Sequence, residues 1–241
     1  QVRQGRRAPR GARAVRVLAA LAAGRTPSRD PVHRTLAAAW APGHRHAADL
    51  IRRALVLIAD HELNASTFAA RVAVSTGTSI YDALAAALAT LKGPRHGGAS
   101  ARAARFVAQI DADAPERAIK DLRSGGERLP GFGHPLYRAA DPRAVALLKA
   151  LAAAGADRRL TEGVVLAAHE IAGVDPNIDY AFAVLSHHLG LPPETGLTLF
   201  AIGRTAGWTA HAIEQRATGR LIRPRARYTG PAPRAPSTNA P

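Results

Sequence analysis

Helical periodicity runs through most of this chain, and no segment shows the strict alternation of apolar and polar residues that predicts a strand. The helical patterns begin at about Ala47. They are expected at residues 47–60, 66–75, 79–91, 100–110, 115–124, 142–155, 161–173, 178–190 and 197–219. Ser66 and Ser79 are expected to cap two of these helices, and three later helices are expected to end at glycine. The sequence therefore predicts an all-α fold.

The two ends of the chain differ in composition from the rest. Residues 1–44 are rich in arginine, and residues 1–16, which show little periodicity, are expected to be flexible. The tail at residues 229–241 is rich in proline and small polar residues and is expected to be disordered. Because the sequence begins with Gln1 and contains no methionine, we expect it to be part of a longer protein.

The formal net charge of +15 comes almost entirely from arginine. Aromatic residues make up only 5% of the chain and leave few rings to stack on bases, so nucleic-acid binding is not expected of this segment. An anionic small molecule suits the charge at least as well. The lack of cysteine excludes disulfides and thiolate metal sites, and it fits a reducing, cytoplasmic location. No apolar run approaches the roughly 20 residues that cross a bilayer, so no membrane partner is expected.

Three histidines lie in loops or at helix ends. His61 directly follows a buried helix, where a hydrogen-bonded junction residue is the alternative to a functional role. His96 lies among glycines, which let backbone approach a ligand closely, and just before a helix start, where the dipole favours a neutral ring. A structural turn is the alternative for His96. His134 lies in a glycine- and proline-rich loop at residues 125–143 that has the composition of a ligand lid.

Charged residues accompany these histidines. Asp179 is near the start of a helix, where N-capping is the ordinary role. Arg204 lies in an otherwise apolar helix, and a buried guanidinium needs an anionic partner such as a carboxylate ligand. Arg143 has simple surface charge as its alternative, and Arg223 lies in a basic patch whose alternative is a solvated tail. Together with the histidines, these side chains suit acid–base chemistry on a dianionic carbonyl compound.

Five motifs of this chain occur in the order in which one enzyme family has them. They are DHELNASTFAARV, LKGPRHGGA, PGFGHPLY followed by DPRA, PNIDYA, and GRTAGWTAHAIEQ followed by RLIRPRARY. On these motifs the chain resembles the citrate synthase family from about residue 45 to residue 229. The resemblance implies an all-helical, two-domain fold with the active site between the domains, and a homodimer. The small domain is then expected at residues 98–192, and the large-domain helices at residues 45–97 and 193–228.

The resemblance also implies a role for each matched residue. His96 is expected to bind the thioester oxygen of acyl-CoA, Asp179 to remove the α-proton, and His134 to protonate the keto oxygen of oxaloacetate. The oxaloacetate carboxylates are expected to be held by His61, Arg143, Arg204 and, from the neighbouring subunit, Arg223. The CoA portion is expected to lie against Leu129, Pro130, Gly131, Phe132 and Gly133.

The implied reaction is a Claisen condensation of acetyl-CoA with oxaloacetate to citrate and CoA. Acetyl-CoA is the co-substrate, and neither a metal nor another cofactor is expected, because the sequence shows no clear metal-ligand spacing. Condensation with propionyl-CoA to 2-methylcitrate and cleavage of citryl-CoA use the same carbon chemistry and stay open. A metabolite-sensing protein without turnover is the alternative from another class.

The chain departs from the family pattern in three places. Only 60 residues precede His61, fewer than is usual in the family, so part of the large domain is expected to be missing. Ser100 stands where asparagine is common, and GFGHPLY replaces a commoner form of that motif. The chain thus resembles a subgroup in which the synthase domain can follow an amino-terminal helix-turn-helix domain.

Overall fold

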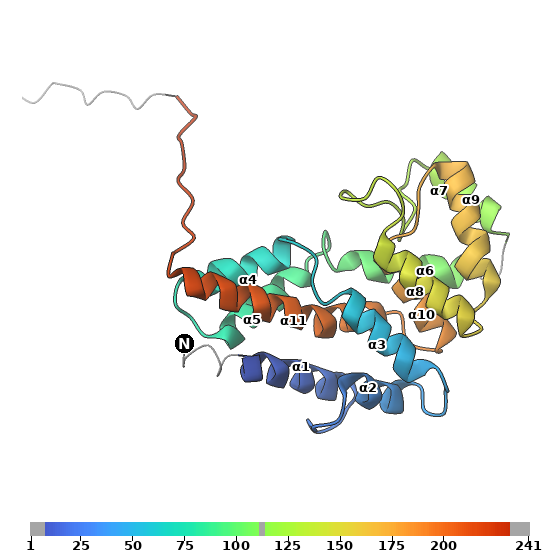
Figure 1. The fold of residues 1–241 in the computed structure, drawn as a ribbon. Coiled ribbons are helices and arrows are strands. Elements are labelled where there is room, and N and C mark those ends of the chain that lie inside the picture. Colours follow the sequence, from blue (N-terminus) through green and yellow to red (C-terminus); the bar gives the residue numbers. More distant parts are fainter. Residues whose placement is uncertain (1–7, 111–113, 232–241) are drawn as a thin grey trace, which may run out of the picture.

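The computed structural model describes residues 8–110 and 114–231, which are drawn as a coloured ribbon in Figure 1. The helices are α1 (Ala8–Ala22), α2 (Val32–Trp40), α3 (Ala47–Leu57), α4 (Ala65–Ser75), α5 (Ile80–Leu91), α6 (Gly98–Ile110), α7 (Pro115–Ser124), α8 (Pro142–Ala153), the π-helical turn η1 (Arg159–Gly163), α9 (Val164–Ala172), α10 (Ile178–His188) and α11 (Thr195–Thr218). The described residues form no strand, so the predicted all-α class is confirmed. Within these ranges no helix is both long and apolar enough to cross a membrane.

The amino-terminal segment contains a helix that the sequence did not predict. Flexibility of residues 1–16 is wrong for residues 8–16, which lie in α1, while residues 1–7 lie outside the described part of the chain. Gly11 marks a close contact in this helix, because a Cβ there would lie 2.3 Å from the side chain of Thr209 in α11. The inner face of α1 is rich in alanine and packs on α11, and its arginines are exposed. The arginines make this apolar face hard to recognise in the sequence.

The second helix, α2, was also missed. Leu36 is fully buried on its inner face, and the indole Nε1–H of Trp40 donates to the carbonyl oxygen of Ala22 at 3.0 Å. This bond joins the end of α2 to the end of α1. Most of the arginine-rich stretch is therefore helical and packs on the rest of the fold.

The long helix α11 organises one half of the molecule. It packs against α1, α3, α4 and α5, and Figure 1 shows it lying below α4 and above α1. Two glycines let the end of α3 approach its backbone: a Cβ at Gly203 would lie 2.4 Å from Ile58, and one at Gly207 would lie 2.3 Å from the carbonyl oxygen of Ala59. The residues just before His61 are therefore pressed against α11.

Helices α6 to α10 make up the other half, on the right of Figure 1. There α10 packs on α6 and α8, and α7 packs on α9. Tyr180 and Phe182 of α10 are fully buried, and the hydroxyl of Tyr180 donates to the carbonyl oxygen of Leu160 at 2.7 Å. The apolar core of this half also includes residues of α3, and the domain boundaries stay a prediction.

N-caps were predicted for both α4 and α5, and the cap of α4 bears on where the Ser66 side chain points. Ser79 caps α5 in a capping box with Asp82, as predicted. The prediction that Ser66 caps α4 is wrong, because Asn64 is the N-cap and its side chain accepts from the N–H of Thr67 at 2.9 Å. Ser66 instead lies inside α4 with no exposed surface, so its hydroxyl is directed into the protein.

Candidate active site

The loop between α7 and α8 is fastened to the start of α10. The backbone N–H of Asn177 donates to Gly131 at 2.9 Å, and its side-chain Nδ2 donates to the carbonyl oxygen of Gly133 at 2.9 Å. Gly131 has a φ of 82°, and a Cβ there would lie 2.8 Å from the Cβ of Tyr180, so this crossing requires glycine. These contacts hold His134 near the amino-terminal end of α10.

The residues predicted to contact CoA lie in this loop and differ in exposure. Leu129 is buried, and Gly133 is exposed. The half-buried ring of Phe132 packs against the core, with its centroid 6.3 Å from that of Phe106 and 4.7 Å from that of Tyr180. A contact between these residues and CoA stays a prediction.

His61, His134 and Tyr137 form a close group. The Nε2 of His61 lies 2.8 Å from the Tyr137 hydroxyl oxygen, and the ring centroid of His134 is 5.3 Å from that of His61 and 4.8 Å from that of Tyr137. The backbone N–H of Leu136 donates to the Nδ1 of His134 at 3.1 Å. Because an accepting Nδ1 leaves the proton of the neutral ring on Nε2, His134 presents an N–H that suits a carbonyl oxygen.

Arg143 is held by a carboxylate on the same helix end. Its Nε and Nη2 donate to the two carboxylate oxygens of Asp141 at 2.9 and 2.7 Å. Burial acts to raise the pKa of Asp141, but the hydrogen bonds and charge of Arg143 outweigh it and hold that pKa below its ordinary value. Asp141 also accepts from the N–H of Ile178 at 3.2 Å, which joins the start of α8 to the start of α10.

Arg204 is fully buried and has no carboxylate partner among the described residues. Its Nε donates to the carbonyl oxygen of Ile58 at 2.7 Å, and its guanidinium carbon lies 4.8 Å from the ring centroid of Phe200. One terminal nitrogen, Nη1, is buried without any hydrogen-bond partner. Burial, aided by the charge of Arg143, lowers the pKa of Arg204 to about 10, so the side chain is still a cation at neutral pH. An uncompensated buried cation points to an anionic ligand.

His61 is the residue on which these charges converge. Burial, followed by the charges of Arg143, Arg204 and His134, lowers its pKa to about 4. His61 is therefore neutral at physiological pH. The structure thus brings together four residues that the resemblance assigned to the keto acid or its carbonyl oxygen.

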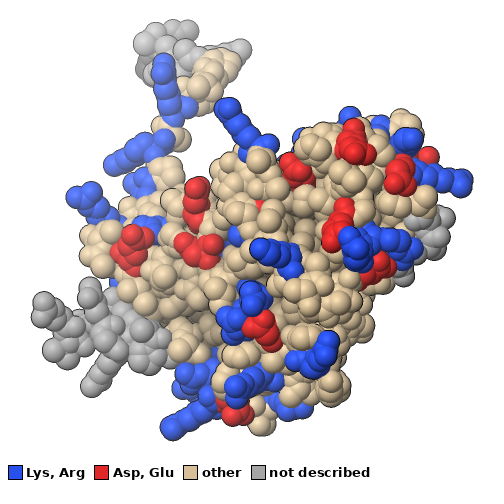
Figure 2. Space-filling model, turned by 45° about the vertical axis from the view of Figure 1, so that its right-hand side comes forward, with Lys and Arg blue, Asp and Glu red and all other residues tan. Residues whose placement is uncertain are grey.

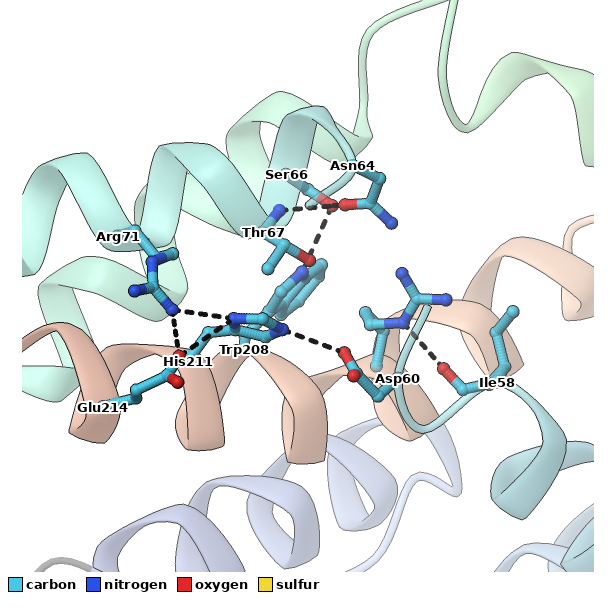
Figure 3. Close-up of polar contacts among 10 residues, drawn as sticks. Ile58, Asp60, Asn64, Ser66, Thr67, Arg71, Trp208, His211 and Glu214 are labelled. Carbon is cyan, nitrogen blue, oxygen red and sulfur yellow. Dashed lines mark hydrogen bonds and ion pairs between the residues drawn. The ribbon is translucent and has the colours of Figure 1, made fainter. Parts of the chain in front are cut away.

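His96 is bound to the inward-facing hydroxyl of Ser66. Its Nε2 lies 2.9 Å from Ser66 Oγ. Ser66 Oγ accepts from the indole N–H of Trp208 at 3.1 Å and donates to Asn64 Oδ1 at 3.0 Å (Figure 3). Burial, followed by the charge of Arg204, lowers the pKa of His96, which keeps the ring neutral. Because Ser66 donates its single proton to Asn64 Oδ1, the Nε2 of the neutral His96 ring carries the proton and donates to Ser66. Nδ1 can donate to a ligand only when the Ser66 hydroxyl turns from Asn64 to His96 and the ring takes its other tautomer.

Asp179 lies in the first turn of α10, but it is not the cap. Asn177 is the cap, and its side chain accepts from the Asp179 N–H at 3.0 Å. The carboxylate of Asp179 therefore does not serve as the helix cap. Ser100 donates a hydrogen bond to one of its oxygens. Burial raises the pKa of Asp179, although the Ser100 bond and the charges of Arg143 and Arg102 oppose this rise. A carboxylate with a raised pKa is a stronger base than an ordinary aspartate.

Three successive residues before His61 are bound by one face of α11. The carbonyl oxygen of Ile58 accepts from Arg204, that of Ala59 accepts from the N–H of Gly207 at 2.9 Å, and Asp60 Oδ1 lies 3.2 Å from the Nε2 of His211. His211 is held in turn by Arg71 and Glu214, as Figure 3 shows. This row of contacts fixes the place from which the His61 side chain leaves the backbone.

Arg223 is not brought to the other residues within one chain. It is exposed in the extended segment after α11, which leads away from the helices in Figure 1. Residues 232–241 of the predicted disordered tail lie outside the described residues. The contact of Arg223 with the site of a neighbouring subunit stays a prediction.

The described part of the chain offers no metal site, and the surface charge seen from one side is mixed. No group of three or more histidine and carboxylate side chains there is placed to hold a metal ion. On the face in Figure 2, basic and acidic side chains are interspersed. The positive groups that matter for the candidate site are the enclosed Arg143 and Arg204, not the many surface arginines.

Comparison with known proteins gives the family. The profile described as "Citrate synthase, C-terminal domain" matches residues 12–225. The chain belongs to the citrate synthase family. A citrate synthase of Haloferax volcanii is 42% identical over 191 residues, which are 76% of this chain and 50% of that protein. This citrate synthase family chain therefore spans about half the length of the curated relatives it matches.

Two solved structures of similar proteins share the fold. The ternary complex of carboxymethyl coenzyme A and oxaloacetate with citrate synthase from Thermoplasma acidophilum aligns with a TM-score of 0.75 and 31% identity, over 93% of this chain and 66% of that chain. Citryl-CoA lyase from Hydrogenobacter thermophilus aligns with a TM-score of 0.77 and 25% identity, over 86% of this chain and 87% of that chain. These alignments confirm the predicted citrate-synthase-like fold.

Several residues of the candidate site were missed by reasoning from the sequence. Ser66, Tyr137 and Asp141 all lie inside motifs that carry the family resemblance, but none of them was assigned a role in the site. An aspartate two residues before a matched arginine, and a tyrosine three residues after a matched histidine, are signals that such motifs offer. The contact between Ser66 and Trp208 joins α4 to α11 and has no signal in local spacing.

Ser66→Ala is expected to destabilise the protein by about 1–3 kcal/mol, because it leaves the buried indole N–H of Trp208 without an acceptor. Urea unfolding of parent and variant measures this difference. Ser124→Ala is the matched control, since Ser124 is exposed at the end of α7, and its effect should stay within about 0.5 kcal/mol. Equal unfolding free energies for Ser66→Ala and the parent would contradict the buried role.

Proposed function

We propose that this chain carries the catalytic residues of a citrate synthase-type acyltransferase, which joins acetyl-CoA to oxaloacetate and yields citrate and CoA. The observation that carries the proposal is the guanidinium of Arg204, whose Nη1 is buried without a hydrogen-bond partner. The charges of Arg204 and Arg143 both lower the pKa of His61, which is neutral. Two cations around a neutral donor match a small dicarboxylate that carries a carbonyl group. Acetyl-CoA is the co-substrate, and no metal or other cofactor takes part.

The chemistry divides between a base and two neutral donors. Asp179 removes a proton from the methyl carbon of acetyl-CoA, and His96 donates to the thioester oxygen as negative charge develops there. Such a donor typically contributes about 3 kcal/mol, without which a carboxylate is too weak a base for a thioester α-proton. The enolate carbon attacks the keto carbon of oxaloacetate, and His134 Nε2–H protonates the keto oxygen. Hydrolysis of citryl-CoA then releases CoA.

The keto acid and the CoA portion occupy different parts of the site in this proposal. His61, Arg143 and Arg204 hold the carboxylates of oxaloacetate, with Arg223 from a second copy. The loop residues 129–133 lie against CoA, and the small domain at residues 98–192 closes over both ligands. Propionyl-CoA is the alternative donor, because one methylene changes binding by only about 1–3 kcal/mol. The cytoplasm is the proposed location, in line with a sequence without cysteine.

A homodimer is part of the proposal because Arg223 lies away from its supposed site within one chain. Sedimentation equilibrium at micromolar concentration should give twice the chain mass. A chain that remains monomeric there, with oxaloacetate present, would leave Arg223 without this role.

Cleavage of citryl-CoA is the second candidate. It is favoured by the mutual coverage of this chain and the citryl-CoA lyase of Hydrogenobacter thermophilus, at 86% and 87%. Addition of citryl-CoA separates the two functions. A synthase hydrolyses it to citrate and free CoA, which a thiol reagent detects, whereas a lyase releases oxaloacetate, which malate dehydrogenase detects through NADH. Neither product above the background of boiled protein would contradict both functions.

A further inference from the structure

The three proposed oxaloacetate residues within one chain are not equally free. Arg204 has a buried Nη1 without a partner, and Arg143 is paired with Asp141 through Nε and Nη2 only. The Nε2 of His61, in contrast, already has a partner in the hydroxyl of Tyr137 at 2.8 Å. A ligand oxygen can therefore reach His61 Nε2 only by replacing that hydroxyl.

Tyr137 fills the space among the groups that would surround the ligand. Its ring centroid lies 5.7 Å from that of His61 and 4.8 Å from that of His134. The guanidinium carbon of Arg143 lies 5.9 Å from the same ring centroid. When Nε2 carries the proton of the neutral His61 ring, the Tyr137 oxygen accepts it, as a carboxylate oxygen of the ligand would.

The backbone around Tyr137 has few packing contacts that would oppose a movement. Pro135, Leu136 and Arg138 are all exposed, with Leu136 exposed to 54%. Segments with exposed side chains and few buried contacts open at low free-energy cost. The Tyr137 side chain can therefore leave His61 without disturbing the apolar core.

We propose that Tyr137 is a latch that a keto acid displaces: its hydroxyl occupies His61 Nε2 in the unliganded protein and leaves when a 2-oxo dicarboxylate binds. This inference rests on the proposed function, because it takes His61 as a ligand-binding residue. Displacement of Tyr137 also affects the orientation of the His134 ring. The peptide N–H that donates to this ring belongs to Leu136, the residue next to Tyr137. The latch thus links occupation of the carboxylate site to the orientation of the group that protonates the keto oxygen.

The sign of the effect on affinity follows from this exchange. A ligand that must first break the bond between Tyr137 and His61 binds more weakly than it would to a site already free. Removing only the hydroxyl should therefore tighten binding. A tyrosine that instead donates to the ligand would give the opposite sign, because the variant would lose a contact.

Tyr137→Phe tests the latch, because phenylalanine keeps the ring contacts with His134 and Arg143 and loses only the hydroxyl. Calorimetric titration with oxaloacetate should give a dissociation constant roughly two- to tenfold lower for the variant than for the parent. Tyr81→Phe is the matched control, since Tyr81 lies on α5 outside the site and is 46% exposed, and it should leave the constant unchanged. Thermal unfolding checks that both variants fold.

A second readout needs no ligand. The ¹⁵N signal of His61 Nε2, assigned by comparison with His61→Gln, should move in unliganded Tyr137→Phe and stay in place in Tyr81→Phe. An unmoved signal, or oxaloacetate binding that is unchanged or weaker in Tyr137→Phe, would overturn the latch. If neither parent nor variant binds oxaloacetate, the proposed function fails, and the latch fails with it for lack of a ligand.

Discussion

Replacing Asp179 with asparagine is expected to lower turnover by about 10²- to 10⁴-fold, the range that general base catalysis typically contributes. Asparagine can still accept the hydrogen bond from Ser100, so the fold and the oxaloacetate site should be kept. Initial rates of CoA release with saturating oxaloacetate measure the loss. Calorimetry should give the same oxaloacetate affinity as in the parent.

The control for this change is Asp121→Asn, an exposed aspartate on α7 outside the site, which should turn over like the parent. Equal rates for Asp179→Asn and the parent would contradict the role of Asp179 as the base. If the parent binds oxaloacetate but has no turnover to lose, the non-catalytic sensing alternative is favoured instead.

The pH dependence of turnover has a sign that follows from the same group. Asp179 acts as a base only when ionised, and burial raises its pKa even though Ser100 and nearby arginines oppose the rise. Turnover is therefore lost as pH falls through this raised pKa, at a higher pH than for an ordinary aspartate with a pKa of about 3.9.

Arg204→Met is expected to have two opposite effects. Oxaloacetate binding should weaken by about 2–5 kcal/mol, because the ligand carboxylate loses the buried cation that donates hydrogen bonds to it. The free energy of unfolding without ligand should rise by about 1–2 kcal/mol. Replacing a buried ion with an apolar side chain of similar size is often stabilising, and the losses are the bond to the Ile58 carbonyl oxygen and the guanidinium contact with the Phe200 ring.

Urea unfolding and calorimetry of the same samples measure both effects. Arg105→Met, on the exposed face of α6, is the control and should change the unfolding free energy by less than about 0.5 kcal/mol. A variant that is less stable than the parent and still binds oxaloacetate would show that Arg204 is structural. That result would remove the observation on which the proposed function rests.

Sequence periodicity predicted the helices from α3 to α11 because their apolar faces are long and their ends are marked. Ser79 is an example of a local signal, since a serine and an aspartate three residues later form the capping box of α5. In α1 the signal failed, because arginines surround a face made of alanines and Gly11, whose small size gives little periodicity. That glycine serves a contact with Thr209, nearly two hundred residues away, which periodicity does not report.

In the candidate site, too, some features could be predicted from the sequence and others could not. Arg204 could be singled out because a cation in an apolar helix conflicts with its surroundings, and the structure gives it an unpartnered buried nitrogen. The contacts of Ser66 with His96 and of Ser100 with Asp179 join residues that are 30 and 79 positions apart. Such pairs depend on how α4, α6 and α10 pack, so the sequence alone gave no reason to connect them.

The central claim is tested most directly by the release of CoA from acetyl-CoA, followed with a thiol reagent, with and without oxaloacetate. The protein has no cysteine and so gives no background in this assay. We predict release that depends on oxaloacetate, with propionyl-CoA in parallel to identify the preferred acyl group. A folded protein that binds oxaloacetate and releases no CoA from either thioester would contradict the claim.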